Sequence, residues 1–243
     1  MFEEPVDHVL VRSGLCSLRS AKNFIKNNEV FVNQSRIEGR DFLFDSEKDV
    51  LSVNGRKVSV SPHIYLMMNK PLGSVCSRKS DSHKTVYDFL PESIKNLPEF
   101  NLLHTVGRLD SETSGLLFFT TNGKLSDYLT RPETHVEKEY EAVLRDSVDK
   151  TRQLEMIKAF SSGVFCEAEK KAQAFTSKPS KLEFLSENKA RLKISEGKFH
   201  QVRRMFSSME NEVVELKRTA IGKIRLPEKL EAGSVMTFSP SLI

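Results

Sequence analysis

The sequence predicts an α+β fold with a small N-terminal module and a larger domain on a mixed, mostly antiparallel sheet flanked by helices. Three observations predict this fold. Turn-forming dipeptides separate short apolar runs in the first sixty residues, segments of alternating polarity recur after residue 64, and helical stripes occur between those segments without regular βαβ alternation. We expect the domains to cover residues 1–60 and 61–243.

The N-terminal module should contain a helix that Ser17 or Ser20 caps and that ends near Asn27. Arg19, Lys22 and Lys26 share one face of this helix. Two interpretations stay open for these cations: contact with a phosphate backbone, and an ordinary solvated helix face.

Two hairpins should follow the helix. The first turns at Asn33-Gln34, and the second turns at Asn54-Gly55, a dipeptide typical of type I′ turns. A helix pair that leads into small strands, with basic residues facing outward, is typical of an RNA-binding module. Residues 57–62 then link this module to the larger domain.

The larger domain should alternate between strands and helices. We expect strands at residues 64–71, 116–121, 139–144, 190–195 and 212–218, and helices at 125–129, 151–160 and 200–209. The run at 116–121 is apolar enough to be buried on both faces of the sheet, and the turn Asn122-Gly123 ends it.

Composition restricts the class of protein. The chain has 243 residues, of which 38% are hydrophobic and 29% charged, as in globular domains. It has no apolar run near the ~18 residues of a membrane span and no signal-peptide core at its start, so we expect a cytoplasmic protein without a membrane partner. Three distant cysteines and scattered histidines argue against a disulfide framework and a metal site.

Charge points to an anionic partner. The chain carries a net charge of +4, and residues 195–225 hold seven Lys/Arg and four Glu, so 7 − 4 = +3 in that window.

Asp110 is the first candidate for chemistry, in the stretch GRLDSETSGLLFFTTNG before the apolar run. A loop fixed by a buried strand is a common place for a catalytic group, but Asp110 could instead accept backbone hydrogen bonds in a turn, as could Ser111 and Thr113. A glycosidase-like carboxylate pair has little support in the sequence, and no GxSxG motif supports a serine triad. A single carboxylate within ~4–6 Å of an arginine stays ionised and nucleophilic, because its pKa falls by ~1–3 units.

The candidate arginines for that role are Arg108, two residues before Asp110, and Arg203 and Arg204 in SEGKFHQVRRMF at a helix start. That segment could equally be an amphipathic helix with exposed arginines. Tyr140, in VEKEYEAVL, is either a core tyrosine or a ring on which a nucleobase stacks.

These segments together resemble a known family. GRLDSETSGLLFFTTNG is similar to the signature of the pseudouridine synthases that modify ribosomal RNA, and MNKPLG, VEKEYEAVL and SEGKFHQVRRMF match the family in its order. Residues 13–37 resemble the S4 RNA-binding module. Within the RsuA/RluB/RluE/RluF family, KISEG and HQVRRMF are most similar to the RsuA branch, which acts on small-subunit 16S rRNA. The large-subunit 23S branch is the near alternative.

The resemblance implies a reaction and residue roles. Uridine becomes pseudouridine without cofactor or metal: the base leaves its sugar at N1, rotates and rejoins through C5. Asp110 is implied as the catalytic carboxylate, which either attacks the sugar or removes a sugar proton. Arg203 pairs with it, with Arg204 as second candidate, and Tyr140 stacks on the flipped uracil and assists proton transfer. The implied substrate-binding residues are Arg108, Thr113, Leu216, Lys70, His200 and Gln201, and the implied RNA-binding residues are Arg19, Lys22 and Lys26.

The implied partner is ribosomal RNA or an assembling ribosomal subunit, bound by a monomer. The rival from another class is an S4-type RNA-binding, ribosome-associated protein without enzymatic activity. It explains the N-terminal cations but gives no reason for Asp110, Tyr140 and the arginine helix together. A metal-dependent nuclease lacks the clustered carboxylates that such sites use.

Overall fold

The computed structural model describes residues 3–46, 48–169 and 172–240 and forms two compact units. The first unit holds the chain up to Tyr65 together with residues 90–104 and 119–126. The second holds residues 66–89, 105–118 and the chain from Asp127 onward. Because the units interleave in sequence, the domain boundary expected after residue 60 stays a prediction.

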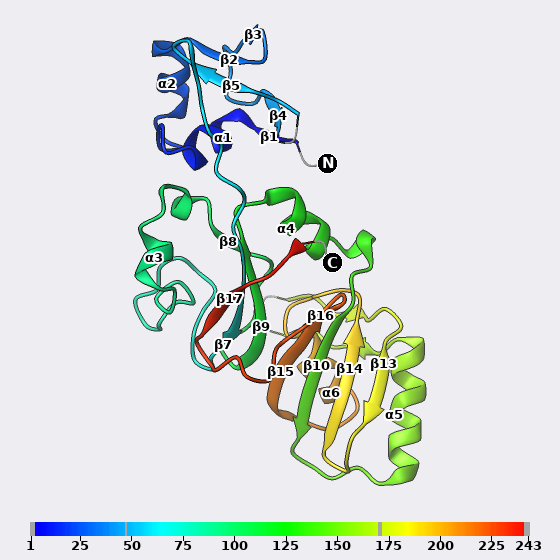
Figure 1. The fold of residues 1–243 in the computed structure, drawn as a ribbon. Coiled ribbons are helices and arrows are strands. Elements are labelled where there is room, and N and C mark those ends of the chain that lie inside the picture. Colours follow the sequence, from blue (N-terminus) through cyan, green and yellow to red (C-terminus); the bar gives the residue numbers. More distant parts are fainter. Residues whose placement is uncertain (1–2, 47, 170–171, 241–243) are drawn as a thin grey trace. The chain divides into compact units, whose positions relative to one another are not determined.

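The first unit combines short helices with two small antiparallel sheets, β3-β2-β5-β6 and β1-β4 (Figure 1). Its elements are β1 (Glu3–Pro5), α1 (Val6–Arg12), α2 (Ala21–Asn27), β2 (Val30–Val32), β3 (Ser35–Arg36), β4 (Leu43–Asp45), β5 (Leu51–Val53), β6 (Arg56–Lys57), α3 (Glu92–Lys95) and the 3₁₀ turn η1 (Pro98–Asn101).

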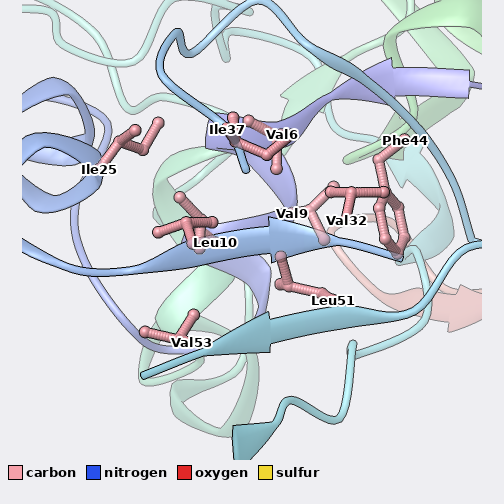
Figure 2. Close-up of a cluster of buried hydrophobic side chains, with 10 residues drawn as sticks. Val6, Val9, Leu10, Ile25, Val32, Ile37, Phe44, Leu51 and Val53 are labelled. Atoms are coloured by element: carbon pink, nitrogen blue, oxygen red, sulfur yellow. The ribbon is translucent and has the colours of Figure 1, made fainter. Parts of the chain in front are cut away.

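Apolar side chains from α1, α2 and the small strands form the core of this unit (Figure 2). Val6, Val9 and Leu10 of α1 are fully buried there, packed with residues such as Phe44 and Leu51. One stripe of a short helix thus covers one face of a short sheet, which is how a small module excludes water.

Both predicted hairpins of this unit are confirmed. Asn33 adopts φ +56° between β2 and β3, and Asn54 and Gly55 adopt φ +50° and +75° between β5 and β6, the paired positive values of a type I′ turn. The helix begins after Ser20, but Ser20 does not cap it through its side chain. Its hydroxyl instead lies 2.8 Å from that of Ser17.

The remaining elements comprise one large sheet in the order β13-β14-β10-β15-β9-β7-β17, with β16 on β15 and β8 on β9, a separate two-stranded sheet of β11 and β12, and the helices between the strands. They are β7 (Tyr65–Lys70), β8 (His104–Thr105), β9 (Thr113–Thr120), α4 (Gly123–Thr130), η2 (Pro132–Thr134), β10 (Lys138–Leu144), α5 (Lys150–Ser162), β11 (Phe165–Cys166), β12 (Phe175–Thr176), β13 (Lys181–Phe184), β14 (Lys189–Ile194), α6 (Gln201–Ser207), β15 (Val213–Ile221), β16 (Ile224–Arg225) and β17 (Val235–Thr237).

This sheet confirms the predicted α+β class. β9 and β15 pair in parallel, while β13/β14, β14/β10, β10/β15 and β17/β7 pair antiparallel. Figure 1 shows β13, β14, β10 and β15 as neighbouring strands with α5 beside β13. The sheet is therefore mixed and mostly antiparallel.

The two faces of the sheet differ in polarity around β10. One face of β10 carries the carboxylates Glu139 and Glu141. The opposite face carries Tyr140, Ala142 and Leu144, all of which are buried. α5 and α6 pack together through Phe160 and Phe206, whose ring centroids are 5.1 Å apart.

β9 is buried along nearly its whole length, as expected for residues 116–121. It also approaches β15 very closely: a Cβ added to Gly115, at φ +102°, would lie 2.2 Å from the carbonyl oxygen of Arg218. Only glycine fits this contact, which fixes β9 against β15. None of the helices among the described residues is long and apolar enough to cross a membrane.

Candidate active site

Asp110 lies in the loop between β8 and β9, on the wall of a cavity of about 600 Å³. Its side chain is 42% exposed. The turn that leads into β9 is closed by the main chain, since the amide of Thr113 donates to the carbonyl of Asp110 at 3.1 Å. Within the described residues the carboxylate itself accepts no hydrogen bond. The backbone carbonyl of Asp110, and not its side chain, therefore accepts the hydrogen bond of the turn. The carboxylate stays available for chemistry.

The last residue of β7 and the segment after it clamp the Asp110 loop at alternate positions. The thiol of Cys76 lies 3.4 Å from both the amide and the carbonyl of Leu109, and the amide of Gly73 donates to the carbonyl of Ser111 at 2.8 Å. The ammonium of Lys70 donates to the carbonyl of Thr113 at 2.9 Å. Such contacts on both sides of Asp110 fix its backbone, which is how a loop holds a reactive group in place.

The clamp corrects the expectation that Lys70 contacts substrate. Lys70 is fully buried, does not line the cavity, and donates to the carbonyls of Pro71 and Thr113. Burial lowers its pKa, and the nearby Cys76 and Asp110 only partly oppose this shift. Burial likewise raises the pKa of the Cys76 thiol. Both side chains therefore contact the backbone of the Asp110 loop and hold it in place.

The cavity brings together eight of the residues proposed from sequence. It is lined by Arg108, Asp110, Thr113, Tyr140, His200, Gln201, Arg203 and Leu216. Tyr140 is buried on β10, at a register shift between Glu139 and Tyr140 in the pairing with β15. Such irregularities often re-aim a side chain beside an active site.

The expected ion pair between Asp110 and an arginine is not formed. Arg203 donates instead to the carbonyls of Glu112, at 2.9 Å, and Val213, while its Nε is buried without a hydrogen-bond partner among the described residues. Within the described residues, the basic nitrogen that comes within 4.0 Å of the Asp110 carboxylate is His200 Nε2, 3.9 Å from Oδ1. The side chain of Arg203 thus binds the backbone of the Asp110 loop at Glu112.

His200 links Asp110 to a second carboxylate. Its Nδ1 lies 3.0 Å from Oε1 of Glu169, and its ring stacks on Phe199 with centroids 3.8 Å apart. The backbone of His200 is left-handed, with φ +50°, where α6 begins. Sequence reasoning missed Glu169 and Phe199. Phe199 lay inside the arginine motif as a visible aromatic, whereas no local signal marked Glu169.

Arg204 does not line the cavity. Its guanidinium donates to the carbonyls of Glu167, Gln173 and Phe199 and packs over the Phe175 ring at 4.5 Å. These contacts tie α6 to the segment before it. Arg204 also lines a neighbouring cavity of about 640 Å³ together with Asp110 and Arg203, so its role as second candidate stays a prediction.

Gln201 also ties the loop before α6. Its Nε2 donates to Glu196 at 2.6 Å, and its Oε1 accepts from the amide of Lys198 at 2.9 Å. Although Gln201 lines the cavity, both ends of its amide are engaged in the protein, so it positions the loop.

The N-terminal cations lie outside this cavity. Arg19, Lys22 and Lys26 are exposed, Arg19 before α2 and the two lysines on it. Exposure agrees with both interpretations of these side chains. Across residues 3–46, 48–169 and 172–240, no group of three or more His, Cys, Asp or Glu side chains could hold a metal ion.

Comparisons with known proteins agree with this geometry. The family model for RNA pseudouridylate synthase matches residues 64–208. The chain is 34% identical over 235 residues to ribosomal small subunit pseudouridine synthase A of Pasteurella multocida, covering 96% of this chain and 95% of the relative. It is 38% identical over 210 residues to the protein of that name from Escherichia coli K12, covering 86% and 85%. A crystal structure of a pseudouridylate synthase aligns over the whole of both chains, with 31% identity and a TM-score of 0.65.

The matching family model and these relatives place the chain in a class of RNA-modifying isomerases. The chain belongs to the RNA pseudouridylate synthase family.

Proposed function

We propose that this chain converts uridine to pseudouridine in the rRNA of the small ribosomal subunit. The relatives that support this substrate are named for the small subunit and match the chain over most of its length. The substrate is free 16S rRNA or an assembling subunit in the cytoplasm. A monomer suffices, since one chain supplies the residues that line the cavity.

One observation carries the proposal: the Asp110 carboxylate accepts no hydrogen bond from the described residues, while its backbone is clamped beside a cavity that Tyr140 also lines. In the reaction the C1′–N1 bond breaks and the C1′–C5 bond forms. N1 gains a proton and C5 loses one, so no oxidant or cofactor is consumed. Asp110 acts on the sugar, and Tyr140 stacks on the uracil and assists the proton transfer at C5.

The other cavity residues shape the site around these two. Arg203 donates to the carbonyl of Glu112 and so holds the loop that carries Asp110. Leu216 gives an apolar wall for the uracil, and Arg108 faces the RNA at the exposed end of the loop.

The target base must leave its stack before it can react, at a cost of a few kcal/mol. Stacking on Tyr140, worth ~1–3 kcal/mol, and cation contacts to the backbone offset this cost. Arg19, Lys22 and Lys26 supply part of the backbone grip. In a variant with all three changed to Gln, we expect the slope of log Kd against log salt to fall by about 0.7–0.9 for each phosphate that the variant no longer neutralises.

The test of the substrate is a map of pseudouridines in rRNA from cells without this gene and from the same cells complemented with it. We expect one 16S position to lose its pseudouridine and complementation to restore it. A pseudouridine missing from 23S rRNA instead would show the small-subunit assignment to be wrong. Unchanged maps, with no activity on transcripts of either rRNA, would refute the proposed function.

A further inference from the structure

A second cavity of about 590 Å³ adjoins the Asp110 cavity. The two share a wall made by Gly107, Arg108, Tyr140, Gly197 and Lys198. We call the second one the cationic cavity, because five cations and two carboxylates line it: Arg108, Lys138, Lys178, Lys198, Arg218, Glu133 and Glu196. Its lining therefore carries 5 − 2 = +3 in formal charge.

Two of these cations are buried. Lys138 is 8% exposed and Arg218 4% exposed, although lysine and arginine are almost never buried without a partner. Lys138 and Tyr140 share a face of β10, and Arg218 of β15 is the register partner of Tyr140. The three side chains thus stand on the same face of the sheet.

Neither buried cation is neutralised by the part of the chain that the structure describes. No carboxylate among those residues lies within 4.0 Å of either, and the ammonium of Lys138 makes no hydrogen bond to them. Arg218 donates from Nε to the carbonyl of Leu116 at 2.8 Å, but its Nη2 is buried without a partner there. Burial, and then the charge of Arg218, lowers the pKa of Lys138. Nη2 of Arg218 is thus a buried, unsatisfied donor, while the ammonium of Lys138 keeps access to solvent in the cavity. The two like charges repel each other until an anion joins them.

The surrounding charges do not supply that anion. Glu196 accepts from the amide of Lys178 and from Gln201, and its other oxygen lies 3.9 Å from Lys198. Glu133 is exposed. Glu139 lies on the opposite face of β10, where Arg225 and Thr219 bind it.

We propose that the cationic cavity binds a backbone phosphate of the RNA next to the flipped uridine. This inference rests on the proposed function. Tyr140 belongs to both cavities, so a uracil stacked there has its neighbouring phosphates within reach of Lys138 and Arg218. Binding the phosphate holds the sugar in register with Asp110 and offsets part of the cost of flipping.

The test compares Lys138→Met, which removes the charge and keeps the length of the side chain, with Lys138→Arg, which keeps the charge. Lys158→Met is the matched control, because Lys158 is an exposed lysine on α5. The probe is unmodified small-subunit rRNA transcribed in vitro, and the readout is Kd over a series of KCl concentrations.

For Lys138→Met we expect about tenfold weaker binding at low salt and a slope reduced by about 0.7–0.9, while the other two variants stay near wild type. Without RNA, Lys138→Met should unfold at the same temperature as wild type or a higher one, because it removes one of two like charges that repel each other. A lower unfolding temperature together with an unchanged slope would show that Lys138 is merely structural and would overturn the proposal.

Inorganic phosphate separates an RNA phosphate from a small ligand. If phosphate raises the unfolding temperature of wild type but not of Lys138→Met, and the RNA slope is unchanged, the cavity serves a small phosphate compound and the proposal is wrong. Failure of the proposed function is distinguishable, because pseudouridine formation is scored separately. Isomerisation with an unchanged Lys138→Met slope refutes the inference alone, and a reduced slope without isomerisation refutes the function alone.

Discussion

Nε2 of His200 lies 3.9 Å from Oδ1 of Asp110, while Nδ1 of the same ring lies 3.0 Å from Oε1 of Glu169. The imidazole therefore stands between the catalytic candidate and a second carboxylate, in the place where sequence reasoning expected an arginine. Its orientation depends on both carboxylates and on the stacked Phe199 ring.

Replacing His200 by Asn should lower kcat/KM by about tenfold, ~1.4 kcal/mol in the barrier, because Asp110 loses its nearest basic neighbour. Asn tolerates the left-handed backbone, so thermal unfolding should be nearly unchanged. His135→Asn is the matched control, since His135 is exposed and also left-handed, at φ +53°. Equal kcat/KM for the two variants would show that His200 has no part in the reaction.

Lys70→Met should impair activity, although Lys70 does not line the cavity. The change leaves the carbonyl of Thr113 without its buried donor, at a cost of ~1–3 kcal/mol in unfolding free energy. The Asp110 loop should then loosen, so the amide of Gly73, which donates to Ser111, should exchange its hydrogen faster than in wild type. Unchanged exchange of that amide would argue against the clamp, and Lys158→Met serves as the exposed-lysine control.

Gly115→Ala should be severely destabilising, by about 3 kcal/mol or more, or should prevent folding. The added Cβ would meet the backbone of Arg218 at 2.2 Å, at a φ of +102°. Gly123→Ala is the control, because a Cβ at Gly123 meets nothing within 4 Å and Gly123 begins α4. Urea unfolding of both variants decides the point. Equal stabilities would mean that β9 and β15 are not held this closely.

The stability of the sheet should fall in acid because of Glu139. Burial alone raises the pKa of this carboxyl, but hydrogen bonds from Arg225 and Thr219 and the charges of Arg225 and Lys193 outweigh burial and bring the pKa to about 2. The folded pKa lies below the ordinary value of 4.5, so the contribution is complete above about pH 5 and is lost as the pH falls toward 2.

We expect Glu139→Gln to cost about 2 kcal/mol in unfolding free energy at pH 6 and much less at pH 3. The measurement is urea unfolding at a series of pH values, with exposed Glu183→Gln as control. A loss for Glu139→Gln that does not shrink between pH 6 and pH 3 would contradict this account.

Much of the fold was predictable because its signals are local. The turn Asn54-Gly55 needs two positive φ angles, and that requirement is written in the two residues themselves. The helix predicted at residues 200–209 is likewise found as α6, where Val202, Met205 and Phe206 are buried. In contrast, β17 pairs with β7 across more than 160 residues, and nothing local in its three residues marks that pairing.

The sequence predicted which residues line the candidate site better than it predicted the contacts that each side chain makes. Asp110, Tyr140 and Arg203 meet at one cavity, as their motifs indicated. The partners of each side chain depend on where distant segments pack, so the sequence alone left open whether Arg203 or Arg204 faces Asp110. For the same reason, the burial of Lys70 and Lys138 became visible only in the structure.

The most direct measurement is the formation of pseudouridine in uridine-labelled 16S rRNA by Asp110→Asn, beside exposed Asp81→Asn as control. Loss of a group that acts on the reacting atoms should lower kcat at least about a thousandfold, while RNA affinity stays within about twofold. Asp81→Asn should match wild type in both. Turnover by Asp110→Asn near the wild-type rate would contradict the assignment of this carboxylate to the chemistry.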